Sequence, residues 1–177
     1  MKLKKEYKME KDTSKGNVFY TLRDDSIFVK LINRLTVIHS VNFKTFIKNI
    51  FINNNDKLQN LYIDLSETLY LDSTFMGILI HINTESNDHK KTFKIINSSK
   101  EALENLRSLG LEKILKIENR EANFKKSEMK EYYCFSDQKN KIFKSMLKSH
   151  ILLSSLSSNN KKEFCTLIKR LKKENYN

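Results

Sequence analysis

The sequence has no proline, no tryptophan, three glycines and two cysteines in 177 residues. The three glycines, Gly16, Gly77 and Gly110, are too isolated to build the glycine-rich loop of a Walker-type or dinucleotide-binding site. Cys134 and Cys165 show no metal-ligand spacing, which predicts reduced thiols in a reducing compartment. The four histidines show no His-x-x-x-His spacing. We therefore expect neither a metal nor any other cofactor.

Long hydrophobic runs are also missing. No stretch approaches the uninterrupted apolar length of a membrane span, and residues 1–16 lack the apolar core of a signal peptide. We expect a cytoplasmic protein in which residues 1–16 form a basic tail. The length favours one domain with a core plus shorter additional segments.

The formal net charge is +12, and most of it lies at the two ends of the sequence. Residues 1–16 carry a net +3 and residues 137–177 a net +7, which leaves +2 for residues 17–136. Only five of the basic residues are arginines, the preferred residue for bidentate phosphate and base contacts. Nucleic-acid binding by the basic tails therefore ranks third among the functions considered.

Residues 17–118 alternate between strand-like and helix-like hydrophobic patterns in the order ββαβαβαβ. The predicted strands are 17–22, 26–32, 58–65, 92–97 and 114–117, and the predicted helices are 43–51, 73–83 and 98–109. Ser40 or Asn42 can cap the first helix, and polar residues 66–68 are expected to interrupt the third strand. Ser98-x-x-Glu101 is a capping-box pattern. Such alternation predicts an α/β fold with helices packed on a mixed sheet.

The remaining segments differ from this domain. We interpret residues 119–136 as a linker or a poorly defined strand, and residues 137–177 as a C-terminal helical hairpin. Asn160-x-x-Glu163 is a possible cap of the second helix. Both apolar faces must be buried, either on the domain, which we favour, or against a partner.

Asp72 and Ser73 stand where the second predicted helix begins. The first backbone N–H groups of a helix are unpaired and carry a partial positive charge, so the fold tolerates a phosphate on Ser73. The added charge would repel an acidic partner surface, as a binding switch requires. Asp and Ser are also among the best N-cap residues, so an ordinary cap remains the alternative. Asp64 and Asp72 lack an accompanying nucleophile or phosphate loop, and an enzyme ranks below the other functions.

These motifs resemble the STAS domain of anti-sigma factor antagonists. Residues 63–66 (Ile-Asp-Leu-Ser) and 71–74 (Leu-Asp-Ser-Thr), followed by a hydrophobic helix with Gly77, carry the resemblance. The ββαβαβαβ order and the Leu-Gly-Leu turn after the third helix are similar too. The residues that match or adjoin the family's partner-binding site are Asp64, Asp72, Ser73, Thr74, Phe75 and Met76. Phe75-Met76 stands where many relatives have Gly-Leu, which predicts a bulkier first helical turn.

The resemblance implies that Ser73 is phosphorylated by an anti-sigma factor, a serine kinase that brings its own ATP. We predict a bacterial anti-sigma factor antagonist that binds this kinase when Ser73 is unmodified and thereby regulates transcription. The C-terminal helices resemble an extension found in some bacterial STAS proteins. The alternative is a STAS scaffold without a switch, or a homo-oligomer assembled through the helices of residues 137–177.

Overall fold

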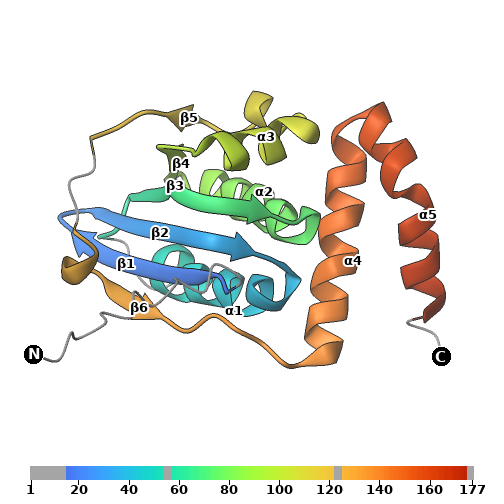
Figure 1. The fold of residues 1–177 in the computed structure, drawn as a ribbon, viewed down its shortest axis with the longest axis horizontal. Coiled ribbons are helices and arrows are strands. Elements are labelled where there is room, and N and C mark those ends of the chain that lie inside the picture. The colour runs from blue at the N-terminus through green and yellow to red at the C-terminus, as the bar shows by residue number, and fades with distance from the viewer. Residues whose placement is uncertain (1–14, 54–56, 122–124, 175–177) are drawn as a thin grey trace, which may run out of the picture.

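A computed structural model describes residues 15–53, 57–121 and 125–174, and it shows a mixed α/β fold (Figure 1). One six-stranded sheet has the order β5-β4-β3-β2-β1-β6. Its strands are β1 (Asn17–Arg23), β2 (Ser26–Leu35), β3 (Asn60–Leu71), β4 (Thr92–Ile96), β5 (Ile117–Glu118) and β6 (Lys130–Tyr132). The helices are α1 (Val37–Ile47), α2 (Ser73–Asp88), α3 (Lys100–Ser108), α4 (Lys139–Leu156) and α5 (Ser158–Glu174). The α/β fold with helices packed on a mixed sheet, and the C-terminal helices predicted from the sequence, are confirmed.

Strand directions follow from the lengths of the connections. β1 and β2 form an antiparallel hairpin whose turn contains Asp24 at φ 55°, a left-handed conformation that a short polar side chain tolerates. β2, β3, β4 and β5 are parallel neighbours, so each connection must cross over, and α1, α2 and α3 make these crossovers. The predicted hairpin and the alternation after it are both present.

The two faces of the sheet are covered differently. α1 and α2 lie behind the sheet in Figure 1, where the rings of Phe43 and Phe75 pack with their centroids 5.0 Å apart. On the opposite face Phe28 and Tyr62 stack at 4.9 Å, and the guanidinium of Arg120 lies 4.3 Å from the Tyr62 ring. None of the helices α1–α5 lies in front of β1, β2 and β3 in this view. The main core is therefore one-sided.

The predicted break in the third strand is wrong, because β3 runs without interruption from Asn60 to Leu71. Its pairing with β2 shifts register between Lys30 and Ile32 and again between Asn33 and Arg34. The hydroxyl of the fully buried Thr68 donates to the carbonyl of Leu31 at 2.8 Å. Bulges thus accommodate the polar residues that the sequence pattern treated as a turn.

The first helix begins earlier than predicted. Thr36 is its N-cap, and the His39 ring accepts from the Thr36 N–H at 3.1 Å, which closes a capping box. Ser40 and Asn42, the expected caps, lie inside α1. A π-helical segment, Lys48–Asn53, continues α1.

Smaller differences occur further along the chain. The N-cap of α3 is Ser99, whose hydroxyl accepts from Ala102 N–H at 3.0 Å, rather than Ser98. Gly110 adopts the expected left-handed conformation at φ 72° after α3. Part of the expected linker forms β6, which pairs antiparallel with β1 and extends the sheet.

The C-terminal helices form an antiparallel hairpin that packs on the domain through α4 (Figure 1). α4 stands across the carboxyl ends of β2 and β3 and contacts α1 and α2, while α5 lies outside it. The side-chain amide of Asn160, expected to cap a helix, is buried instead. It donates to the carbonyls of Leu109 at 3.1 Å and Leu153 at 3.2 Å, and so ties α5 to the turn after α3 and to α4.

The crossing of α2 and α4 is close at Gly77. A Cβ placed on Gly77 would lie 2.5 Å from Ser149 Cβ and 2.9 Å from Ser149 Cα. Because no side chain can occupy that space, a glycine on α2 and a small residue on α4 let the two helices approach each other.

We predict that Gly77→Ala destabilises the protein. In a helix interior this change ordinarily stabilises by about 1 kcal/mol. Here the added methyl group pushes α4 away, and overpacking should lower the free energy of unfolding by about 1–3 kcal/mol. Urea unfolding measures the change, with Asn87→Ala at an exposed position of the same helix as control. A Gly77→Ala variant at least as stable as the parent chain would contradict the close crossing.

Candidate functional site

Asp72 caps two helices with one carboxylate. Its Oδ1 accepts from the Phe75 N–H in the first turn of α2 at 2.7 Å. Its Oδ2 accepts from the Val37 N–H at the start of α1, also at 2.7 Å. The Asp72 N–H donates to the Leu35 carbonyl at the end of β2 at 3.1 Å. The side chain therefore fixes the first turns of α1 and α2 relative to each other and to the sheet.

Two opposing effects act on the pKa of the Asp72 carboxyl group. Burial raises the pKa of Asp72, whereas hydrogen bonds from the backbone of Phe75, Val37 and Thr74 oppose that rise. Both helix N-termini also place partial positive charge beside the carboxylate. Asp72 is thus a structural anchor whose acceptor atoms are already occupied.

The Ser73 hydroxyl is not the cap of α2, since the side chain of Asp72 fills that role. Ser73 is the first residue of α2, and its Oγ lies 2.8 Å from Nε2 of His150 on α4. The tautomer of His150 determines which of the two groups donates the hydrogen bond. Of the two interpretations that the sequence left open, the ordinary cap therefore belongs to Asp72, and the hydroxyl of Ser73 contacts the C-terminal extension.

His150 is the group that covers Ser73. The residue is only 3% exposed, and its ring packs 5.0 Å from the ring of Phe164 on α5. Burial lowers the pKa of His150. The imidazole is therefore neutral at neutral pH, as its apolar surroundings require.

Three of the expected partner-binding residues lie in the core. The exposed fractions of Thr74, Phe75 and Met76 are 3%, 0% and 5%. The bulkier first turn expected from Phe75-Met76 is real, but its bulk points inward, with Phe75 against Phe43. In this conformation these three side chains are buried, and their part in partner binding stays a prediction.

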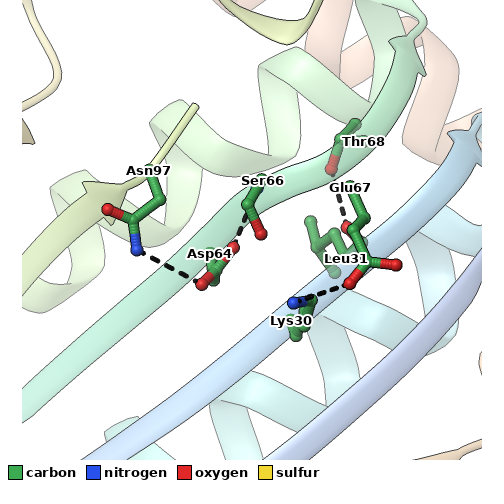
Figure 2. Close-up of polar contacts among 7 residues, drawn as sticks. All are labelled: Lys30, Leu31, Asp64, Ser66, Glu67, Thr68 and Asn97. Carbon is green, nitrogen blue, oxygen red and sulfur yellow. Dashed lines mark hydrogen bonds and ion pairs between the residues drawn. The ribbon is translucent and has the colours of Figure 1, made fainter. Parts of the chain in front are cut away.

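Asp64 belongs to a different cluster (Figure 2). It lies within β3 opposite Ile96 of β4 instead of ending a strand. Its Oδ1 accepts from the Ser66 N–H at 2.8 Å, and its Oδ2 lies 3.4 Å from Nδ2 of Asn97. Figure 2 shows Lys30 and Glu67 nearby, paired at 2.8 Å. These contacts do not bring Asp64 to Asp72 and Ser73.

Sequence reasoning missed His150 as part of the site. It occurs in no recognisable motif, and 77 positions separate it from Ser73. The sequence held only an indirect signal for this contact. Gly77 is a small residue in an otherwise bulky helix, and Ser149 is a small residue next to His150. Small residues of this kind indicate helix surfaces that let two helices approach each other closely.

The described residues also limit the chemistry of the site. In residues 15–53, 57–121 and 125–174, no group of three or more His, Cys, Asp or Glu side chains is arranged to hold a metal ion. Among the same residues, no helix is long and apolar enough to cross a membrane.

Comparison with known protein families identifies one that matches this chain. The model of the STAS domain family matches residues 18–124, a range that ends before α4. Among curated protein sequences, none matches the chain.

Three similar solved structures are described as anti-sigma factor antagonists, one of them as a putative one. SpoIIAA, an anti-sigma factor antagonist in its unphosphorylated form, is 11% identical with a TM-score of 0.50, covering 57% of this chain and 86% of that one. An anti-sigma factor antagonist from Mycobacterium paratuberculosis is 16% identical with a TM-score of 0.51, covering 59% and 86%. TM1081 from Thermotoga maritima is 20% identical with a TM-score of 0.51, covering 58% and 86%. At these identities the likeness establishes the shared fold.

We predict that Asp72→Ala costs about twice as much stability as loss of a single cap. Removing one N-cap side chain typically costs about 1 kcal/mol and up to about 2. Asp72→Ala removes two hydrogen bonds to N–H groups at helix starts, whereas Ser157→Ala removes one, from the Asn160 N–H of α5. Urea unfolding of the two variants and of Asp72→Asn, which keeps one acceptor oxygen, measures this difference. Equal losses in Asp72→Ala and Ser157→Ala would contradict the double role of Asp72.

We also predict that acidification weakens the fold through His150. Because its pKa in the folded state lies below 6.5, the unfolded chain takes up the proton first as the pH falls through 6.5. The free energy of unfolding should therefore fall as the pH drops through 6.5. His39 and His81 have lowered pKa values too, so the measurement compares the parent chain with His150→Gln. The variant should show a shallower pH dependence, and an unchanged slope would contradict the assignment.

Proposed function

This chain belongs to the STAS domain family, and we propose that it acts as an anti-sigma factor antagonist, a protein-binding switch controlled by phosphorylation of Ser73. The proposal rests on one observation: Asp72 and Ser73 have different roles at the start of α2. Asp72 caps the helix, so the Ser73 hydroxyl can be modified without removing a capping interaction. The comparison with proteins described as anti-sigma factor antagonists supports the same function.

The proposed partner is an anti-sigma factor that is itself a serine kinase with its own bound ATP. The unmodified chain binds this partner at Asp72, Ser73 and the adjoining face of α2, which releases a sigma factor and so regulates transcription. A phosphate adds about −1.5 to −2 charges at neutral pH. Beside the Asp72 carboxylate, this charge repels an acidic partner surface and ends the complex.

The position of α4 adds a condition to this switch. The Oγ of Ser73 and Nε2 of His150 are 2.8 Å apart, so a phosphoryl group cannot enter between them while α4 is docked. A partner that reaches the start of α2 must likewise displace α4, since the helices touch at Gly77 and Ser149. The C-terminal hairpin therefore competes with the kinase for Ser73.

The same contacts favour a second candidate, a STAS module without a switch. If α4 never leaves, Ser73 and His150 form a structural hydrogen bond and the start of α2 is permanently covered. In that case any partner binds elsewhere, and modification of Ser73 has no role.

The experiment that tests the switch mixes the full chain with its cognate serine kinase and ATP and identifies phosphorylated residues by mass spectrometry. We expect one phosphate on Ser73 and none in Ser73→Ala. The unmodified chain and Ser73→Ala should bind the kinase, whereas Ser73→Asp should bind at least about tenfold more weakly, a change of about 1.4 kcal/mol. Ser73 without phosphate, together with equal binding of all three chains, would favour the module without a switch.

The competition with α4 has its own test. His150→Ala removes the hydrogen bond to Ser73 and part of the packing on Phe164. It should therefore raise the rate of Ser73 phosphorylation, whereas Ser155→Ala, at an exposed position of the same helix, should not. Equal rates in the parent chain and both variants would mean that α4 does not limit access.

A further inference from the structure

A pocket of about 200 Å³ lies between α1, α2 and α4, beside the crossing of Gly77 and Ser149. Its basic lining comes from all three helices: Lys44 on α1, His81 on α2, and Lys141, Lys144 and Lys148 on α4. The three α4 lysines are spaced i, i+3 and i+7, which places them on one face of that helix. Residues far apart in the sequence thus bring positive charge to one concave site.

The positive charge of this pocket is only partly offset by a nearby acid, Glu85. No Asp or Glu lines it. Glu85, one helical turn beyond His81, pairs with Lys48 at 3.2 Å. None of the four lining lysines forms an ion pair with a described carboxylate, in contrast to Lys94, which pairs with Glu118 at 2.9 Å.

Burial and nearby charges shift the pKa of two lining residues. Burial lowers the pKa of Lys44, the charge of Glu85 opposes this, and the charges of Lys148 and Lys48 lower the pKa by smaller amounts. Burial also lowers the pKa of His81, and the charge of Lys44 adds to this. Like charges at the junction of three helices repel each other, and an anion between them removes that cost.

We propose that this pocket binds the phosphate groups of a small anionic ligand. Lysine ammonium groups are common phosphate ligands. The Ser149 hydroxyl in the same wall is buried with no hydrogen-bond partner among the described residues and is a further donor close by. About 200 Å³ is less than the roughly 300–1,000 Å³ of a site for a drug-sized molecule, so the pocket holds phosphate groups rather than a whole cofactor.

Binding at this site has a structural consequence. The lining lysines of α4 and Lys44 of α1 lie on helices that must stay together for α4 to remain docked. A bound anion attracts both, and a ligand that binds only the docked arrangement stabilises it by mass action. The pocket therefore couples the concentration of a phosphate compound to the position of the C-terminal hairpin.

Isothermal titration of the full chain with pyrophosphate, at ionic strength held constant with sodium chloride, tests the proposal. We expect saturable binding at one site. Lys44→Gln and Lys148→Gln should each weaken it by about tenfold, the usual effect of losing a hydrogen bond to a charged group. Lys172→Gln on α5, exposed and outside the pocket, is the matched control and should bind as the parent chain does.

Two further measurements sharpen the outcome. Amide NMR shifts should move at Gly77, His81 and Ser149 on addition of pyrophosphate, and the melting temperature should rise. Adenosine diphosphate binding more tightly than pyrophosphate would identify the phosphate end of a larger ligand, and equal binding would identify free phosphate compounds. Unsaturable binding, or equal weakening by Lys172→Gln and Lys148→Gln, would overturn the site in favour of diffuse attraction to a basic protein.

Discussion

The carboxylate of Asp72 is the interaction on which the candidate site depends. It accepts a hydrogen bond from the first turn of α2 and another from the start of α1, each at 2.7 Å. Because one side chain holds both helix ends, Ser73 occupies a fixed place at the carboxyl edge of the parallel strands. The same arrangement relieves Ser73 of the capping role and leaves its hydroxyl to interact with whatever lies over the start of α2.

In this structure α4 lies over the start of α2. The contact combines a tight backbone approach at Gly77, a hydrogen bond from Ser73 to a buried histidine, and the Asn160 amide that ties the hairpin to the turn after α3. Opposing these contacts is the positive charge gathered where α4 meets α1 and α2. The hairpin is thus held by packing and polar contacts against an electrostatic cost, a balance that a partner or an anion can shift.

The sequence predicted those features that depend on neighbouring residues. The β1–β2 hairpin, the alternation of strands and helices, and the left-handed Gly110 follow from local periodicity and turn chemistry, as does the place of Ser73 at a helix start. Features that depend on distant contacts were left open or missed. β6 has no apolar pattern and is stabilised by pairing with β1, so the sequence left residues 119–136 as a linker or a poorly defined strand. The contact between Ser73 and His150 joins positions 77 residues apart and was missed.

We propose that a partner binds the start of α2 by displacing α4, and hydrogen–deuterium exchange on a complex with the proposed anti-sigma factor tests this most directly. Faster exchange across Lys139–Leu156 together with slower exchange in the first turns of α2 is the expected result. A complex in which α4 remains as protected as in the free chain would contradict it and would place the partner on another surface.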